Sequence, residues 1–193
     1  MDMKYKLTDE TKVVDNITLH RIECVTAFGN VEFGAKGGWI ESEKNLSQDG
    51  NAWVSGNAKV CGNATVSENA WVSENAKVGG NATVEENAWV YGNAVVGGNA
   101  RVSGNAKVGG NAKVCEKEDF IVFKNWWSSG RYFTWTRSNN KWKVGCFYGS
   151  GEELIKKAYN DSEKSGREYE RVVKYVESIL QDEDNGNRNK REG

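Results

Sequence analysis

A six-residue repeat occupies the middle third of this sequence. Residues 49–114 form eleven consecutive hexads, each ending in Asn-Ala-x-Val. Asn, Ala and Val keep their positions in all eleven, and the residue before Asn is Gly in eight and Glu in three. Repeats of fixed period indicate stacked units that share one continuous core, because a single unit buries too little to be stable.

Each hexad position has a physical reason. In Ala-x-Val, the alternation of a short strand places Ala and Val on one side and x on the other. A small residue and a β-branched residue suit a narrow packed interior. The Gly-Asn or Glu-Asn pair supplies the corner, since Gly and Asn tolerate positive φ angles. Asn side chains stacked from coil to coil are expected to hydrogen-bond in ladders.

This block resembles the hexapeptide-repeat, left-handed parallel β-helix family. That family's pattern is an aliphatic residue, four variable positions that include a turn Asn or Gly, and a small residue before the next strand. Residues 54–59, Val-Ser-Gly-Asn-Ala-Lys, match it. The resemblance implies a triangular prism with three hexads per coil and therefore three to four coils. It also implies the left hand, whereas the usual crossover rule predicts the right hand.

The segments around the prism complete a mainly β fold class. We expect an irregular N-terminal cap with a degenerate first coil in residues 1–48. Its strands are predicted at 4–7, 12–14 and 19–25, with a turn at Asp15-Asn16. The degenerate coil comprises residues 33–40 and 45–47. An atypical end repeat protects the open strand edges of a prism.

The region after the prism has a different composition, with ten aromatic residues between 119 and 148. It predicts a small α+β domain over 115–181 and a charged, disordered tail over 182–193. A three-stranded antiparallel sheet is expected at 119–126, 131–137 and 141–148. Two helices follow, the first over 151–160 behind a capping box of Ser150 and Glu153, the second over 164–181.

Three tryptophans are predicted to form one outward column. An 18-residue coil places Trp53, Trp71 and Trp89 at the same phase, followed by Lys107. Stacked indoles make a large apolar patch, and such patches mark interfaces. The column is therefore our candidate interface. Its cover is left open between the C-terminal domain or another protomer, a partner protein, and a carbohydrate.

A second candidate site lies on the predicted strand 131–137. Alternation places Arg131, Phe133, Trp135 and Arg137 on one face, within a segment of six basic and two acidic residues (117–149). Arginines beside aromatic rings suit a nucleotide or single-stranded nucleic acid, through stacking and phosphate charge. The alternative is a half-buried sheet packed on its helices, with the Arg head groups reaching solvent.

Residue inventory excludes several functions. The 26 basic and 27 acidic residues give a formal charge of −1, which removes simple electrostatic grounds for a nucleic-acid binder or an acidic mimic. Acyltransferases that resemble the prism use a His base, whereas the hexads hold no His and His20 is expected to be structural or exposed. Zinc enzymes of the family need three His ligands, which a single His cannot supply. Ice-binding prisms present Thr-x-Thr, whereas these hexads present Ala-x-Val. We therefore predict no enzyme, no cofactor and no metal site.

Cellular context follows from cysteine usage and hydropathy. The four cysteines show neither metal nor dense disulfide spacing, which indicates a reducing cytoplasm. No apolar run reaches the roughly 18 residues of a bilayer span, so we predict no membrane partner. Self-association as a trimer or dimer is expected, since hexapeptide prisms similar to this one assemble through their flat faces.

The layout also resembles a group of uncharacterised bacteriophage and prophage proteins with GNAxV hexads. Residues 5–11 (YKLTDET), 37–48 (GGWIESEKNLSQ) and 145–150 carry this resemblance. It implies a non-enzymatic phage accessory protein that acts by binding a host or phage protein in the host cytoplasm, with a component of antiviral defence as the favoured target. Three alternatives remain: a nucleotide-signal or single-stranded nucleic-acid binder, a virion or polysaccharide-contact protein and, more distantly, an acyltransferase.

Overall fold

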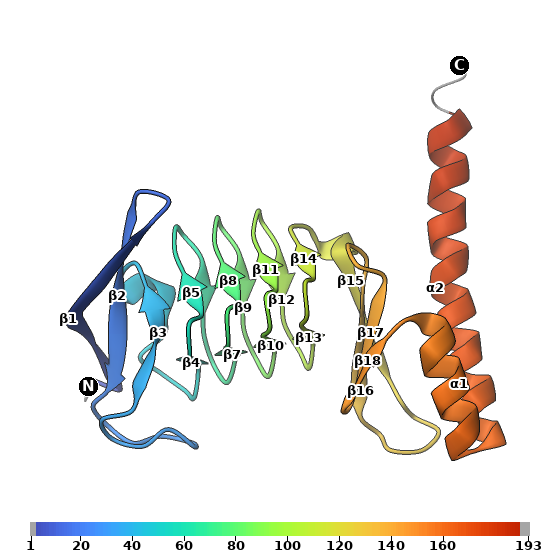
Figure 1. The fold of residues 1–193 in the computed structure, drawn as a ribbon, viewed down its shortest axis with the longest axis horizontal. Coiled ribbons are helices and arrows are strands. Elements are labelled where there is room, and N and C mark those ends of the chain that lie inside the picture. Colours follow the sequence, from blue (N-terminus) through green and yellow to red (C-terminus); the bar gives the residue numbers. More distant parts are fainter. Residues whose placement is uncertain (1–2, 190–193) are drawn as a thin grey trace.

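The computed structural model describes residues 3–189, which are arranged along one long axis (Figure 1). An N-terminal hairpin stands at one end, a stack of short-stranded coils follows, and a sheet with two helices closes the other end. The mainly β class and the β-solenoid of about four turns are confirmed. One hydrophobic core runs through the cap and the coils, and a second lies inside the C-terminal domain.

Each hexad contributes one two-residue strand, and the strands stack in parallel on three faces. The first face is β4-β7-β10-β13, the second is β6-β9-β12, and the third is β5-β8-β11-β14. The strands are β4 (Trp53–Val54), β5 (Lys59–Val60), β6 (Thr65–Val66), β7 (Trp71–Val72), β8 (Lys77–Val78), β9 (Thr83–Val84), β10 (Trp89–Val90), β11 (Val95–Val96), β12 (Arg101–Val102), β13 (Lys107–Val108) and β14 (Lys113–Val114).

The interior and the corners follow the predicted hexad chemistry. Every Ala and Val of the Asn-Ala-x-Val columns is at most 1% exposed. The residue before each Asn adopts the positive φ, which explains why eight of eleven are Gly, while Glu68, Glu74 and Glu86 adopt it as well. The predicted Asn ladders are present, for example Asn51 Nδ2 to Asn69 Oδ1 at 3.0 Å and Asn81 Nδ2 to Asn99 Oδ1 at 3.0 Å.

The N-terminal cap is a hairpin that extends the third face. Strand β1 (Tyr5–Val14) pairs with β2 (Ile17–Cys24) through a turn in which Asp15 and Asn16 have φ angles of 51° and 65°. Two separate strands were expected at 4–7 and 12–14, but one irregular strand spans both. Strand β3 (Lys36–Ile40) pairs antiparallel with β2 and parallel with β5, and a short 3₁₀ helix, η1 (Glu43–Asn45), follows. Strand β3 thereby stacks in parallel on the hexad strands of the third face.

The C-terminal domain contains one strand more than predicted. After a 3₁₀ turn, η2 (Lys117–Asp119), the described residues form a sheet in the order β15-β16-β17-β18. The segment expected as one strand at 141–148 is divided by Gly145, whose φ is 55°. The strands are β15 (Phe120–Lys124), β16 (Tyr132–Thr136), β17 (Lys141–Val144) and β18 (Phe147–Gly149).

Two helices cover the outer face of this sheet. Helix α1 (Gly151–Asp161) begins at the predicted capping box, and α2 (Glu163–Asn189) follows. The prediction of a disordered tail is wrong for 182–189, which continue α2, and residues 190–193 lie outside the described residues. No Pro interrupts this stretch, and Arg137 pairs with Glu183 at 2.5 Å. No helix of the described chain is both long and apolar enough to cross a membrane.

The inner face of the C-terminal sheet closes the end of the prism. Thr134 Oγ1 accepts the backbone N–H of Lys107 at 3.0 Å, and Ser138 Oγ accepts that of Lys113 at 2.7 Å. These side chains satisfy donors that the last coil would otherwise present to solvent or to another strand. The sheet is therefore covered on both faces, by the prism on one side and by the helices on the other.

Candidate ligand-binding groove

The tryptophan column exists, but its three members differ in exposure. Trp53, Trp71 and Trp89 pair in register, and Lys107 follows Trp89. Trp53 is only 2% exposed, because the cap covers it and the Phe28 ring packs edge-on against it at 5.5 Å. The N-terminal segment therefore covers Trp53, and this cover was not among the alternatives considered from the sequence. Trp71 is half-buried and Trp89 is 40% exposed.

The two accessible indoles are held in fixed orientations. Trp71 Nε1 donates to Ser55 Oγ at 3.1 Å, and Trp89 Nε1 donates to Ser73 Oγ at 2.9 Å. The Tyr91 ring lies 5.0 Å from the Trp89 ring, and Lys107 Nζ lies 5.5 Å from its centroid. A hollow of about 410 Å³ runs along both indoles between Asn69, Asn87 and Lys107. Rigid aromatic surfaces of this kind bind planar groups at low entropic cost.

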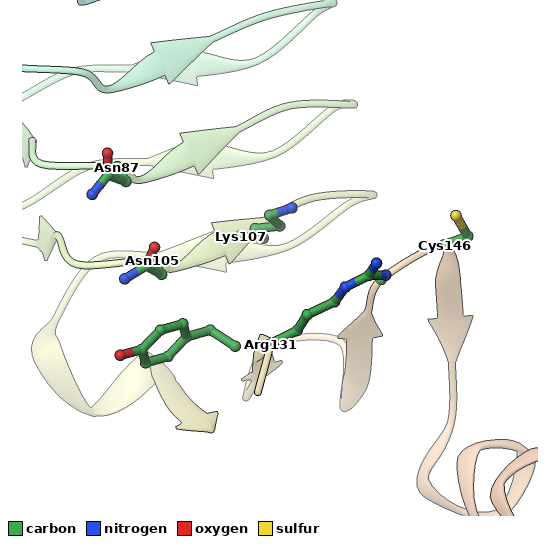
Figure 2. Close-up of a pocket in the computed structure, with 7 residues that line it drawn as sticks. Asn87, Asn105, Lys107, Arg131 and Cys146 are labelled. Carbon is green, nitrogen blue, oxygen red and sulfur yellow. The ribbon is translucent and has the colours of Figure 1, made fainter. Parts of the chain in front are cut away.

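A second hollow, of about 470 Å³, lies where the prism meets the C-terminal domain (Figure 2). The coils contribute Asn87, Asn105 and Lys107 to it. The C-terminal domain contributes Arg131, Tyr132, Gly145 and Cys146. Both hollows include Asn87 and Lys107, so they adjoin. We call the combined feature the junction groove.

The junction groove is positively charged. Its lining includes Lys107 and Arg131, and none of its lining residues is acidic. Figure 2 shows Lys107 on a coil and Arg131 on the C-terminal domain, both beside the hollow. Cations near a low-dielectric wall attract anions more strongly than cations in bulk water do. The groove thus joins an aromatic surface to an anion-attracting pair, and Lys107 lies where the two meet.

Two asparagine side chains of the groove have free donors within the part of the chain that the structure describes. The Asn51–Asn69–Asn87 ladder ends at Asn87, since among the described residues Asn87 Nδ2 donates to nothing. Asn105 is next in the column and also makes no side-chain hydrogen bond in that part of the chain. Both amides line the groove and are available to a ligand's acceptors.

The predicted ligand face on strand β16 is not accessible as a whole. Phe133 and Trp135 are each 1% exposed, because helices α1 and α2 pack over that face of the sheet. Trp135 Nε1 donates to Asn140 Oδ1 at 2.8 Å. Arg137 contacts Glu183, and this ion pair raises the pKa of the guanidinium. The proposed stacking on Phe133 and Trp135 is therefore corrected, and Arg131 alone of the four residues lines the groove.

Sequence reasoning missed most of the groove. Lys107, Tyr132 and Cys146 were not identified as site residues, and neither were the two asparagines. The 18-residue column did place Lys107 directly after Trp89, which was the one available signal. The lone histidine is elsewhere: His20 lies on β2 with Nδ1 3.5 Å from the carbonyl oxygen of Thr8. It does not line the groove.

Comparison with known proteins supports the class of fold. Residues 58–74 and 76–92 match the family model described as the YdcK beta solenoid repeat. The fold and this match together define a β-solenoid of the hexapeptide-repeat type. The chain is also similar to the "Uncharacterized acetyltransferase YdcK" of Escherichia coli strain K12, with 34% identity over 73 residues. That alignment covers 33% of this chain and 22% of the relative, so the chain spans about a fifth of the relative's length.

This similarity contradicts one prediction. From the residue inventory we expected a non-enzymatic protein, but the relative is named as an acetyltransferase. That prediction is not retained. The residue inventory was misleading because it searched the hexads only for the His base of one acyltransferase mechanism. A solenoid scaffold does not decide the chemistry of the sites built on it, so the absence of that His does not exclude an enzyme.

Proposed function

We propose that this protein binds an anionic ligand with a planar ring, of the nucleotide class, in the junction groove. The observation that supports this most is the pairing of two cations, Lys107 and Arg131, with no acidic neighbour in the lining, beside the exposed ring of Trp89. In the proposed complex, the phosphate of the ligand lies between Lys107 and Arg131, and its base stacks on the indole of Trp89. The free amides of Asn87 and Asn105 supply further donors in the groove.

The size and charge of the groove favour a small ligand over a nucleic-acid strand. Strand binding needs a basic track that neutralises several phosphates. Here two cations line a groove of limited length, and the formal charge of the chain is −1. A single nucleotide or dinucleotide matches these features better than a polymer does.

Titration calorimetry with ADP and adenosine tests the proposal. We expect ADP to bind and adenosine to bind more weakly, because adenosine lacks the charge that contacts Lys107 and Arg131. Lys107→Ala and Arg131→Ala should each weaken ADP binding about tenfold, the loss expected for one charge-assisted contact. Lys113→Ala is the matched control, since Lys113 is an exposed prism lysine on another face and does not line the groove.

The outcome for Trp89 separates a groove site from diffuse electrostatic attraction. Trp89→Ala should weaken both ADP and adenosine by a similar factor, because it removes the stacking surface and leaves the cations in place. If all three lysine and arginine variants lowered ADP affinity equally, the attraction would be general. If neither compound bound, the nucleotide class would be wrong.

Acyl transfer is a second candidate, favoured by the similarity to the acetyltransferase-named relative. Acetyl-CoA carries a nucleotide and an acyl thioester, so the same groove is its proposed site. We expect thiol release from acetyl-CoA, in the presence of amine or sugar acceptors, to fall in the Arg131→Ala variant. His20→Ala should leave it unchanged, since His20 lies outside the groove. Loss of activity in His20→Ala alone would place the reaction elsewhere.

Further proposals concern the cellular role of the protein and its partners. The bacteriophage resemblance of residues 5–11 and 37–48 supports a phage accessory protein in the host cytoplasm, with a host or phage protein partner and antiviral defence as target. The surface formed by Trp71 and Trp89 supports self-association as a dimer or trimer, or contact with a polysaccharide. A second protomer seated on Trp89 would compete with a ligand in the groove.

A further inference from the structure

A separate cavity lies on the third face of the prism, away from the junction groove. It has a volume of about 230 Å³ and lies, partly open to solvent, between the tip of the β1–β2 hairpin and residues of β5, β8 and β11. The hairpin contributes Val14, Asp15, Ile17 and Leu19. None of the residues that line the junction groove lines this cavity. We call it the hairpin pocket.

The walls of the hairpin pocket are mainly apolar. Val14, Ile17 and Leu19 face the prism across it, and Leu19 is 2% exposed. On the prism side, Val95 occupies the column that holds Lys59, Lys77 and Lys113 at the other levels. Among the hexads, Val95 is the one apolar residue of this column, and it is half-buried and lines the pocket. The position at which Val95 replaces a lysine is therefore also the position at which the prism side of the pocket is apolar.

Two unpaired lysines stand at the edge of this apolar space. Lys59 and Lys77 are neighbours in register and both line the pocket. Among the described residues, neither amine forms a salt bridge. Lys59 Nζ makes only a long contact, 3.4 Å, with the carbonyl oxygen of Asn57. Adjacent lysines one strand apart repel each other unless an anion lies between them.

Further cations beside Lys59 add to this positive charge. Lys12 Nζ lies 3.8 Å from the centroid of the Trp39 ring, and the Arg21 guanidinium lies 5.0 Å from it. Burial, with repulsion from Lys59 and Arg21, lowers the pKa of Lys12 to about 8. Arg21 Nε is buried and has no hydrogen-bond partner among the described residues.

Several carboxylates lie near these cations. Glu10 pairs with Lys36 at 3.1 Å, and Glu23 pairs with Lys6 at 3.3 Å. Glu41 accepts the backbone N–H of Gly62 at 2.6 Å. Asp15, at the exposed hairpin turn, is the acidic residue in the lining of the pocket. Burial, with repulsion from Glu41 and Asp15, raises the pKa of the Cys61 thiol, which also lines the pocket. The lining itself holds two lysines and one aspartate, a formal charge of +1.

We propose that the hairpin pocket binds an aliphatic chain with a carboxylate head, as in a medium-chain fatty acid. The chain lies between Val14, Ile17 and Val95, and the carboxylate lies between the amines of Lys59 and Lys77. Apolar walls bind the chain by removing it from water, and the paired amines supply the charge complement. At roughly 30 Å³ per water-sized group, the pocket admits about seven or eight such groups, which matches a chain of about eight carbons.

Titration calorimetry on the full chain with octanoate, 1-octanol and acetate tests this proposal. We expect octanoate to bind most tightly, because 1-octanol lacks the charge and acetate lacks the chain. Equal affinity for octanoate and acetate would show anion binding without a pocket and would overturn the proposal. Failure of octanoate to bind at millimolar concentration would overturn it as well.

Variants locate the site without disturbing the core. Lys77→Gln should weaken octanoate binding about tenfold, the loss of one charge-assisted contact. Val95→Lys restores the lysine column and should abolish binding, because the longer side chain fills the pocket. Lys113→Gln, in the same column but outside the lining, is the matched control and should bind as the parent does.

Two further measurements make the result decisive. Circular dichroism and melting temperature should be unchanged in all three variants, since each alters an outward position. Arg131→Ala should bind octanoate normally, which separates this site from the junction groove and from any failure of its proposed function. Unchanged octanoate affinity in both Lys77→Gln and Val95→Lys would overturn the assignment.

Discussion

We expect Val78→Asp to lower the free energy of unfolding by about 4 kcal/mol, through the burial of an unpaired carboxylate in a dry core. Val78 is 1% exposed and stacks in register between Val60 and Val96. The Val column offers no polar partner, so the carboxylate must either be buried uncompensated or displace the coil. Urea and thermal unfolding, followed by circular dichroism, measure the effect.

The adjacent position provides the control. Lys77 lies on the same strand, β8, but points outward and is exposed. Lys77→Asp introduces the same carboxylate and should change stability by no more than about 0.5 kcal/mol, as is usual for surface sites. If Lys77→Asp were the more destabilising of the two, the inward and outward faces of the hexads would be reversed.

Trp135→Ala should cost the C-terminal domain about 3–5 kcal/mol, the range observed when a buried Trp or Phe is truncated. Trp135 is 1% exposed and lies in the core with Phe133, Trp142 and Leu154. The substitution also removes the donor to Asn140. Limited proteolysis should show faster cleavage within residues 115–183, while the prism keeps its resistance because its core is separate.

Arg131→Ala is the matched control for this prediction. Arg131 is exposed and immediately precedes strand β16, so its truncation should leave the protease pattern and melting temperature unchanged. The pair of variants distinguishes the two interpretations of the Arg-aromatic segment. A Trp135→Ala protein as resistant as the parent would mean that the ring is not part of the core and is again a candidate for ligand stacking.

Alternation predicted correctly that Phe133 and Trp135 share one face, and the 18-residue period predicted correctly that Trp53, Trp71 and Trp89 stack. In neither case did the sequence reveal which segment of the chain covers that face. Helices α1 and α2 bury the first face, and Phe28 with the rest of the cap buries Trp53. Periodicity is a local property, whereas cover depends on contacts between segments distant in the chain.

The junction groove likewise could not be predicted from local sequence patterns. Its two cations, Lys107 and Arg131, belong to different parts of the chain and meet because Thr134 and Ser138 dock the C-terminal sheet on the last coil. No spacing in the sequence encodes that docking. The hairpin pocket is similar, since only the folded hairpin brings Ile17 and Leu19 opposite Val95.

The hexads alone were enough to predict a solenoid and the inward direction of every Ala and Val, because each unit repeats the same local constraints and contacts mainly its neighbours. The three faces followed from the resemblance to the hexapeptide-repeat family. The sequence also determined the start of α1, since a capping box is a local pattern. Local patterns could not predict which outward residues stay accessible or where cations gather. Those properties arise where non-repetitive segments pack against the prism, and the energy of that packing is spread over long-range contacts that no local pattern contains.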